Sequence, residues 1–354
     1  MRNRPRQRPR WSYARSTGVP RGDVGTALRA LLRSARYQPP RSHGRAVPIP
    51  GHYAGLLRIG PTIVALTTDT VGTKVMLAEE VDRFEPIGED MVAVNVNDLA
   101  AVGARPAAMV DVISCARPDP KVFAALGRGM RRGLRRSECA LVGGETAVVP
   151  ELVSGWDVGG TAMGFFPPGR SPVTGHAVRP GDRILGLRAN GFHANGFTLV
   201  RALLKEGAVD LGRPRRGARV NLADELLRPT RIYTRASEAL ADGPGVTGFA
   251  HISGGGVRNL VRLNDHVDYV LDRWPRPSGL FAWAQNAGNL SDEEMYQTFN
   301  VGIGFVVIVR PRALARCVQR LARAGFPDVV EVGRVGRGHG VHLPHLGLEY
   351  LGYS

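Results

Sequence analysis

The sequence predicts a two-domain α/β protein. Its 354 residues are enough for two domains, and a hydrophobic fraction of 43% is typical of a soluble globular protein. Apolar segments with the length of strands alternate with segments of helical periodicity along most of the chain. The Pro-Pro-Gly-Arg stretch at residues 167–170 is the best linker candidate. We therefore expect a disordered tail at residues 1–20, one domain at 21–168 and a C-terminal α/β domain at 169–354.

Composition narrows the class of protein. No apolar run approaches the roughly 20 residues that cross a bilayer, and no apolar segment follows the N-terminal arginines as in a secretory signal. Cys115, Cys139 and Cys317 are scattered and form no CxxC pair. We therefore expect reduced cysteines in a cytoplasmic protein without a membrane partner.

The net charge of +16 raises the question of nucleic acid. Only three of the 47 basic residues are lysines, and the arginines are spread over the chain, whereas a nucleic-acid reader concentrates its charge. The aromatic fraction of 6% also argues against base stacking, so no nucleic-acid partner is expected. Every second residue from 2 to 10 is arginine, which predicts disorder. A weak polyanion-binding arm, a targeting peptide or an over-extended start are the alternatives for that run.

Local patterns predict the elements of the first half in order. Residues 23–36 have apolar side chains at helical spacing, and the proline-rich residues 38–51 are typical of a connector. A short strand is expected at 56–59. The apolar run at 63–66 has the length and β-branched content of a buried strand, and it leads to Asp69.

A helix is predicted at residues 89–102, where Asn95 and Asp98 share the face that otherwise looks inward. A paired amide and acid on a buried stripe can also be a satisfied structural network, and that alternative stays open. The next strand, at 107–113, carries Asp111, which can bind a ligand or simply cap a loop.

Three more elements complete the first half. Residues 121–136 have a clear amphipathic pattern, with apolar side chains on one side and arginines facing water. A strand at 139–142 is expected to deliver the segment Gly143-Gly144-Glu145-Thr146 to its end. A strand at 161–166 closes this half.

Four acids of this half stand beside apolar segments: Asp69, Asp98, Asp111 and Glu145. A carboxylate at the edge of a core is costly unless a cation meets it. Four such acids within one span therefore indicate a divalent metal, and Lys74 with the nearby glycine-rich backbone indicates phosphate groups.

The second half opens with a strand at 183–187, which runs into the glycine-containing loop 191–196 and then a helix. A similar loop at 253–256 precedes another helix, and His193 and His251 accompany the two loops. Glycine-rich loops that open helices present free backbone N–H groups and suit phosphate, although glycine also makes ordinary turns.

The C-terminal residues alternate a strand at 301–309 with a helix at 314–324. His339, His342 and His345 follow at a spacing of three. Such spacing can bind a metal, but the surrounding prolines and glycines argue against a preformed site.

The segment Asp98-Leu-Ala-Ala-Val-Gly103-Ala104-Arg-Pro106 matches the D-x4-G-A-x-P signature of the ATP-dependent aminoimidazole ribonucleotide synthetase superfamily. That superfamily also contains formylglycinamide ribonucleotide amidotransferase, thiamine-monophosphate kinase, selenophosphate synthetase and a hydrogenase maturation factor. Four other segments resemble the synthetase itself, namely 142–147 (VGGETA), 227–233 (LRPTRIY), 251–256 (HISGGG) and, the most specific, 293–300 (EEMYQTFN). The resemblance runs from about residue 13 to residue 335, and the chain resembles members of the phosphoribosylformylglycinamidine cyclo-ligase family.

That resemblance implies ring closure in purine synthesis, from formylglycinamidine ribonucleotide and ATP to aminoimidazole ribonucleotide, ADP and phosphate. The γ-phosphoryl group moves to the formyl amide oxygen, and the amidine nitrogen then attacks that carbon and expels phosphate. Such catalysis is mostly positioning and charge neutralisation, with Mg²⁺ as the expected metal. The resemblance also implies a homodimer in which the domain at 21–168 binds ATP and contributes strands to an intersubunit β-barrel.

The resemblance further implies roles for individual residues. Asp69, Asp98 and Glu145 are the expected Mg²⁺ ligands, and Asp98, Lys74 and His193 are the expected catalytic residues. The residues expected to contact ATP are Asp69, Gly72, Thr73, Lys74, Asn95, Asp98, Gly143, Gly144, Glu145 and Thr146. The residues expected to contact the ribonucleotide substrate are His193, Asn195, His251, Gly254, Gly255 and Gly256.

The chain departs from the family pattern at three places. Thr70 stands where the family usually has glycine, and only Gly51 and Gly55 remain of a glycine-rich segment before the first strand. Residues 190–196 are Asn-Gly-Phe-His-Ala-Asn-Gly in place of the common Ser-Gly-x-His-Ser-Asn-Gly. These changes bear on nucleotide affinity and geometry more than on the reaction.

Two alternatives stay open. The first is another ATP-dependent member of the superfamily. Against it, no cysteine lies near the N-terminus, the chain ends Leu-Gly-Tyr-Ser, and a thiamine-monophosphate kinase would not explain residues 293–300. The second is an inactive paralogue whose basic surface binds RNA or a partner, and such a protein should lose affinity steeply with salt and ignore ATP.

Overall fold

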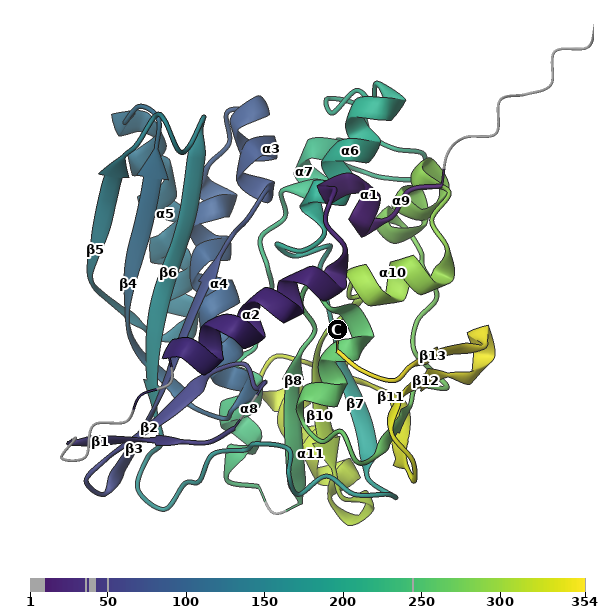
Figure 1. Cartoon of the computed structure of the whole chain (residues 1–354). Coiled ribbons are helices and arrows are strands. Elements are labelled where there is room, and N and C mark those ends of the chain that lie inside the picture. Colours follow the sequence, from purple (N-terminus) through teal and green to yellow (C-terminus); the bar gives the residue numbers. More distant parts are fainter. Residues whose placement is uncertain (1–9, 36, 38–42, 50, 244, 354) are drawn as a thin grey trace, which may run out of the picture.

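The computed structural model describes residues 10–35, 37, 43–49, 51–243 and 245–353. Two halves stand side by side, each built on its own β-sheet with helices, and the two halves meet around one central helix (Figure 1). The α/β fold predicted from the sequence is confirmed.

The first half holds a six-stranded sheet. Its elements are β1 (Gly44–Val47), β2 (Gly55–Ile59), β3 (Thr62–Thr70), α3 (Lys74–Glu80), α4 (Glu85–Ala101), β4 (Arg105–Cys115), α5 (Pro120–Ser137), β5 (Ala140–Val148) and β6 (Trp156–Phe165). The strand order is β1-β2-β3-β6-β4-β5, so β1 and β5 form the two edges. Neighbouring strands are antiparallel except β4 and β5, which are parallel.

Helix α4 fills the space between the first sheet and the second half. Its apolar residues Ile87, Met91 and Val92 are fully buried because the helix packs on β3 and β6 of its own half and on β8 (Val246–His251) of the other. α5 packs against α4 at very short range, since a Cβ on Gly88 would overlap the Leu126 carbonyl. α4 is therefore the element that positions side chains between the two halves.

The amphipathic helix predicted at 121–136 is present as α5. Val122, Leu126 and Met130 are buried, as the periodicity indicates. The expected solvated arginine face is present, since Arg128, Arg131 and Arg135 are exposed. Arg128 and Arg132 also pair with glutamates at the start of α4.

The second half holds a seven-stranded sheet. Its elements are β7 (Arg183–Arg188), α6 (Phe197–Gly207), α7 (Leu222–Leu226), α8 (Thr234–Ala241), β8, η1 (Gly256–Arg262), β9 (Asp268–Val270), α9 (Leu280–Gly288), α10 (Asp292–Thr298), β10 (Ile303–Val309), η2 (Pro311–Ala313), α11 (Leu314–Arg323), β11 (Val330–Gly336), β12 (Gly340–Leu343), η3 (Pro344–Leu346) and β13 (Leu348–Tyr350). The strand order is β13-β12-β9-β11-β7-β10-β8. Pairing is antiparallel except between β9 and β12.

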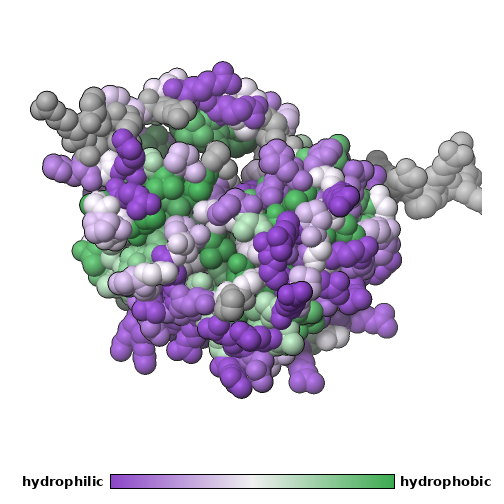
Figure 2. Space-filling model, turned by 90° about the horizontal axis from the view of Figure 1, so that it is seen from below, coloured by the Kyte–Doolittle hydropathy of each residue, from purple (hydrophilic) through white to green (hydrophobic). Residues whose placement is uncertain are grey.

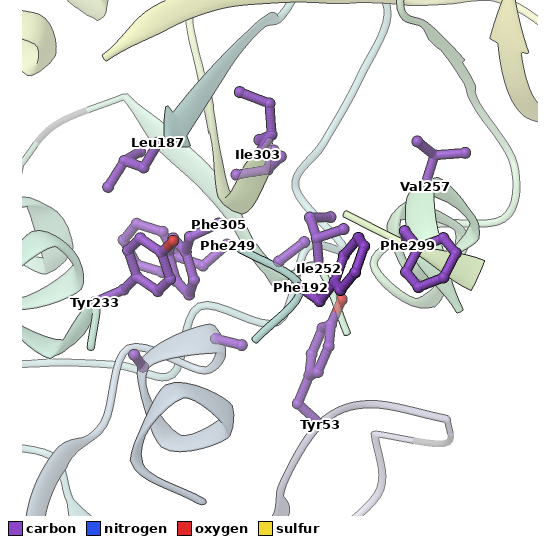
Figure 3. Close-up of a cluster of buried hydrophobic side chains, with 14 of the residues drawn as sticks. Tyr53, Leu187, Phe192, Tyr233, Phe249, Ile252, Val257, Phe299, Ile303 and Phe305 are labelled. Carbon is purple, nitrogen blue, oxygen red and sulfur yellow. The ribbon is translucent and has the colours of Figure 1, made fainter. Parts of the chain in front are cut away.

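The second sheet is covered on both faces. Every residue of β10 is buried, and aromatic side chains pack around it, including Tyr233 stacked on Phe305 with ring centroids 5.3 Å apart. Figure 3 shows this cluster and a second aromatic group around Phe192 and Phe299. Tyr53 of the first half reaches toward that second group, so the two cores are continuous.

The first sheet is covered on one face only, which corrects the expectation of a buried strand at 63–66. Alternate residues of β3 point to opposite faces, and Ala65 is buried whereas Leu66 is exposed. Leu66 lies opposite Met163 of β6, and Val110 and Val112 of β4 share this outer face and are exposed too. In Figure 2 hydrophobic atoms gather on the left of the molecule, the side on which Figure 1 places this sheet.

Two N-terminal expectations change. Within residues 10–20, placed in the expected disordered tail, α1 (Tyr13–Thr17) forms behind a Ser12 N-cap, and the Tyr13 N–H donates to Glu294 Oε1 at 3.0 Å. Residues 1–9 of the expected tail lie outside the described residues. The predicted connector at 38–51 contains β1, which pairs with β2, while residues 38–42 and 50 are also outside the description.

The helix predicted at 23–36 is present as α2 (Arg21–Ala35). None of the described helices has the length and apolar character needed to cross a membrane.

Candidate active site

Asp69, Asp98 and His251 come together where the two halves meet. Asp69 lies near the end of β3 on the inner face of the first sheet, Asp98 is on α4, and His251 ends β8. His251 Nδ1 lies 2.8 Å from Asp98 Oδ1, and His251 Nε2 is buried without a hydrogen-bond partner among the described residues. Burial, and then the charge of Asp98, raise the pKa of Asp69 to about 6. Two neighbouring carboxylates of this kind favour a bound cation.

Asn95 adds an oxygen to this pair. Its Nδ2 donates to the Met91 carbonyl at 2.9 Å and to the Asp69 carbonyl at 3.4 Å, whereas its buried Oδ1 has no partner within the described chain. A buried acceptor left unpaired is costly, and two carboxylates with an amide oxygen suit a hard cation such as Mg²⁺. The described residues gather no group of three or more His, Cys, Asp or Glu side chains as a metal site. These three side chains therefore fit a Mg²⁺ ion that shares its remaining positions with phosphate oxygens or water.

Three predicted loops converge on one pocket of about 540 Å³. The loop after β3 contributes Gly72 and Thr73, and the two glycine-containing loops of the second half contribute Asn195, Gly196, Gly254 and Gly255, with Thr198 and Arg258 beside them. Thr73 Oγ1 and Thr198 Oγ1 are 3.0 Å apart, so the halves touch at the pocket floor. Gly72 is three residues after Asp69, and Gly254 is three residues after His251. Three residues of extended chain span at most about 10 Å. The carboxylate pair and the pocket are therefore neighbours.

Lys74 does not line this pocket. Its side chain is fully buried, and Nζ lies 2.7 Å from Asp90 Oδ2, 2.9 Å from the Arg228 carbonyl and 3.0 Å from the His193 carbonyl. Burial lowers the pKa of Lys74, and the charge of Asp90 opposes that shift. An ammonium group has three donors, and these three protein oxygens lie within 3.0 Å of Nζ. A phosphate contact is expected for Lys74 from the sequence, but its side chain instead links α4 of the first half to the His193 and Arg228 carbonyls of the second half.

His193 is likewise turned into the protein. Its backbone is left-handed at φ 62°, and its ring is fully buried with no hydrogen-bond partner for either nitrogen among the described residues. Burial is the main reason that the pKa of His193 lies well below its usual value, so the ring is neutral. The ring packs against β10, where a Cβ on Gly304 would overlap both His193 and Tyr233. Asn195 of the same loop, rather than His193, lines the pocket.

The segment 143–146 lies within β5, not at the end of a strand as expected. Glu145 lies opposite Val112 on the outer face of the sheet, whereas Asp69 is on the inner face. The strand order also places β5 three strands from β3, about 14 Å at the usual spacing. Gly143, Gly144, Glu145 and Thr146 are therefore not brought to the pocket of their own chain.

The last predicted acid, Asp111, and the C-terminal histidines contact neighbouring residues outside the pocket. Asp111 lies on the inner face against Gly144, where a Cβ would overlap the Asp111 carboxylate, and partial burial raises the pKa of Asp111. His342 Nε2 lies 2.9 Å from Asp268 Oδ1. His339 and His345 form no metal cluster with it within the described residues.

Comparison with known proteins decides the family. Two family models match: the N-terminal domain of AIR synthase related proteins over residues 51–166, and the C-terminal domain over 179–345. The relative named phosphoribosylformylglycinamidine cyclo-ligase in Thermococcus gammatolerans is 42% identical over 300 residues, covering 84% of this chain and 87% of the relative. The relative of that name in Pyrococcus furiosus is 38% identical over 344 residues, covering 96% and 99%. The chain belongs to the phosphoribosylformylglycinamidine cyclo-ligase family. The family membership expected from the sequence motifs is confirmed.

Solved structures share the fold of this cyclo-ligase family member. A chain of the HypE–HypF complex superposes with a TM-score of 0.65 at 15% identity, covering 92% of this chain and 97% of the other. A ThiL complexed with AMPPCP and TMP superposes with a TM-score of 0.63 at 17% identity, covering 95% and 97%. At these identities the likeness is one of fold.

The cyclo-ligase segment 227–233 carries contacts that sequence reasoning missed. Asp90 Oδ1 on α4 accepts hydrogen bonds from Thr230 N at 2.7 Å and Thr230 Oγ1 at 2.5 Å. Asn97 donates to the Arg231 carbonyl at 2.9 Å and accepts from Tyr233 N at 2.8 Å. The motif itself was the available signal, but its partners on α4 lie more than a hundred residues away and follow only from the fold.

Proposed function

We propose that this chain uses ATP to close formylglycinamidine ribonucleotide into aminoimidazole ribonucleotide, with release of ADP and phosphate. The observation that carries the proposal is the meeting of Asp69, Asp98 and His251 beside a pocket built from three glycine-containing loops. Relatives at 42% and 38% identity that are named for this activity support it.

Asp69 and Asp98, with the Asn95 amide oxygen, would hold Mg²⁺. The ion supplies neutralisation of phosphate charge when it is bound, as phosphoryl transfer requires. The backbone N–H groups of the glycine loops and the Thr73 hydroxyl are the groups of this chain that would orient phosphate oxygens.

His251 is the residue that we assign to proton transfer. The His251 Nδ1–H donates a hydrogen bond to the Asp98 carboxylate. In the neutral ring the other nitrogen, Nε2, then carries a lone pair and can accept a proton, and it has no partner within the described residues. When the amidine nitrogen attacks the phosphorylated formyl carbon, the carbon–oxygen bond to phosphate breaks and the nitrogen loses a proton. His251 Nε2 accepts that proton, and Asp98 stabilises the resulting imidazolium.

Lys74 and His193 receive supporting roles in this proposal. Lys74 fastens the loops that contain His193 and Arg228 to α4, and the buried His193 ring anchors the loop that presents Asn195 to the pocket. Both side chains position the site without touching the reacting atoms.

We also propose that the chain works as a homodimer whose first sheets face each other. The support is the exposed apolar outer face formed by Leu66, Val110, Val112 and Met163, since a large exposed patch of this kind marks an interaction site. Glu145 lies on that face, so it would reach a metal or nucleotide only across the interface.

The test is an assay of the purified chain with formylglycinamidine ribonucleotide, ATP and Mg²⁺, following the amine product and ADP together. Asp98→Asn removes the carboxylate charge that would bind the metal and stabilise the His251 imidazolium, and we expect turnover to fall by about 100-fold or more. The matched control is Asp265→Asn, whose carboxylate is exposed at the surface, and it should keep full activity.

Full activity of Asp98→Asn would remove Asp98 from the reaction. Absence of turnover in the unchanged chain, together with salt-sensitive RNA binding that ignores ATP, would favour the inactive paralogue instead.

A further inference from the structure

The N-terminal segment crosses from one half of the molecule to the other. Its start is fixed to the second half, because Trp11 N donates to the Gly288 carbonyl at 3.1 Å, Trp11 Nε1 donates to Glu206, and Tyr13 N donates to Glu294. Its end is fixed to the first half, where β1 pairs with β2. α2, which we call the strap, lies between these two attachments and crosses the front of the molecule in Figure 1.

The apolar side of the strap faces the pocket rather than a core. Val24, Leu28 and Leu32 line the pocket, yet they remain 58%, 51% and 60% exposed. On α5, by contrast, the apolar residues Val122, Leu126 and Met130 are at most 8% exposed, as is usual for the apolar side of an amphipathic helix. The strap therefore presents an apolar surface to a hollow that the chain itself does not fill.

The opposite wall of the same pocket is polar. It is made of the glycine loops with Thr73, Asn195, Thr198 and Arg258. Arg29 of the strap also lines the pocket, and its guanidinium donates to Thr26 Oγ1 at 3.0 Å within the same helix. A ligand that fits both walls has an organic body that can lie against aliphatic side chains and an anionic end, with arginines on either side to match its charge.

We propose that the strap is a movable wall that closes on a bound ribose phosphate, with Leu28 and Leu32 packed on the organic body and Arg29 paired with the phosphate. The proposal rests on the proposed function, which supplies two ligands of this chemistry, ATP and the ribonucleotide substrate. Closure would place the apolar stripe against the ligand and exclude water from the phosphoryl transfer. The hydrogen bonds of residues 11–13 and the pairing of β1 with β2 hold the described parts on either side of the strap to the two halves.

Binding measurements test the proposal without relying on turnover. Calorimetric titrations of the unchanged chain, Arg29→Gln and Leu28→Ser are made with the Mg²⁺ complex of AMPPCP and separately with formylglycinamidine ribonucleotide. We expect each variant to weaken one of the two ligands by about tenfold or more, because each loses a charge-assisted hydrogen bond or an apolar contact. The ligand that is weakened identifies the occupant of the pocket.

Arg33→Gln is the matched control, since Arg33 lies on the strap but does not line the pocket. Its affinities should stay within about twofold of the unchanged chain. All three variants should melt within about 2 °C of the unchanged chain, because their side chains lie outside the buried core.

Limited trypsin digestion gives an independent measurement. The ligand that the binding data single out should slow cleavage after Arg29 and Arg33 in the unchanged chain. In Arg29→Gln, which lacks the first of these cleavage sites, the same ligand should slow cleavage after Arg33 less. Unchanged affinities for both ligands, equal losses in the Arg33→Gln control, or cleavage that neither ligand slows would overturn the proposal. A chain that binds AMPPCP under the strap but does not make the cyclised product would contradict the proposed function while leaving the strap proposal standing.

Discussion

The outer face of the first sheet and the junction between the two halves are opposite kinds of surface. The outer face is apolar and exposed, with Leu66, Val110, Val112 and Met163 each at least 37% exposed. The junction is polar and buried, and Lys74 and its partner Asp90 are fully enclosed. Buried polar groups persist only where they are paired, and exposed apolar groups on this scale call for a partner. The junction is completed within one chain, whereas the outer face is not.

The largest expected effect comes from removing the buried Lys74–Asp90 ion pair at the junction. Lys74→Met leaves the buried Asp90 carboxylate without its cation, and we expect a loss of about 3–5 kcal/mol in the free energy of unfolding. Denaturant unfolding followed by circular dichroism measures it. The matched double variant Lys74→Met with Asp90→Asn removes both charges and keeps an acceptor for Thr230, so it should recover much of the loss. A loss below about 1 kcal/mol in the single variant would show that the pair does not hold the halves together.

A second prediction concerns acid and the same junction. His52 lies beside Arg262, which donates to its carbonyl at 2.9 Å, and burial, then the charge of Arg262, lower the pKa of His52 to about 4. The unfolded chain takes up a proton near pH 6.5 that the folded chain refuses, so the stability present above pH 6.5 is lost as the pH falls toward 4. His52→Phe should reduce the difference in unfolding free energy between pH 7.5 and pH 4.5 by about 2–3 kcal/mol. Parallel pH profiles of the two proteins would contradict the assignment.

The third prediction concerns the exposed outer face of the first sheet. Val112→Asp puts a charge in the middle of the outer face, and in the proposed homodimer it should weaken association by about 30-fold or more, equivalent to about 2 kcal/mol. Sedimentation equilibrium measures the dissociation constant. The matched control is Val220→Asp, an exposed valine of the second half, which should leave association unchanged. A Val112→Asp variant that associates as tightly as the unchanged chain would mean that this face is not the interface.

Particular residues show how far sequence reasoning reaches. The periodicity of residues 121–136 predicts α5 and its buried stripe, since a helical pattern depends only on local spacing. The spacing of Asn95 and Asp98 predicts their shared face on α4, and the glycine loops near 195 and 254 do meet at one pocket. These features follow from chain-local rules.

Other residues could not be placed in that way. The apolar run at 63–66 has the same pattern whether one or both faces of its strand are covered, so its half-exposure depends on elements elsewhere. Glu145 lies opposite Val112 because of strand register, and the sequence of β5 alone does not fix that register. Residues 11–17 are ordered by acceptors on α9 and α10, far along the chain.

By itself, the sequence determined the alternation of strands and helices, the family motifs and the acids and loops that make up the site. Only the tertiary structure decided that Lys74 points inward and that the apolar stripe of α2 faces a hollow. The physical reason is that the position of a buried side chain depends on the groups that contact it, and those groups come from distant parts of the sequence. The oxygens around Lys74 come from Asp90, His193 and Arg228, which are far apart in sequence and meet only when the two halves close.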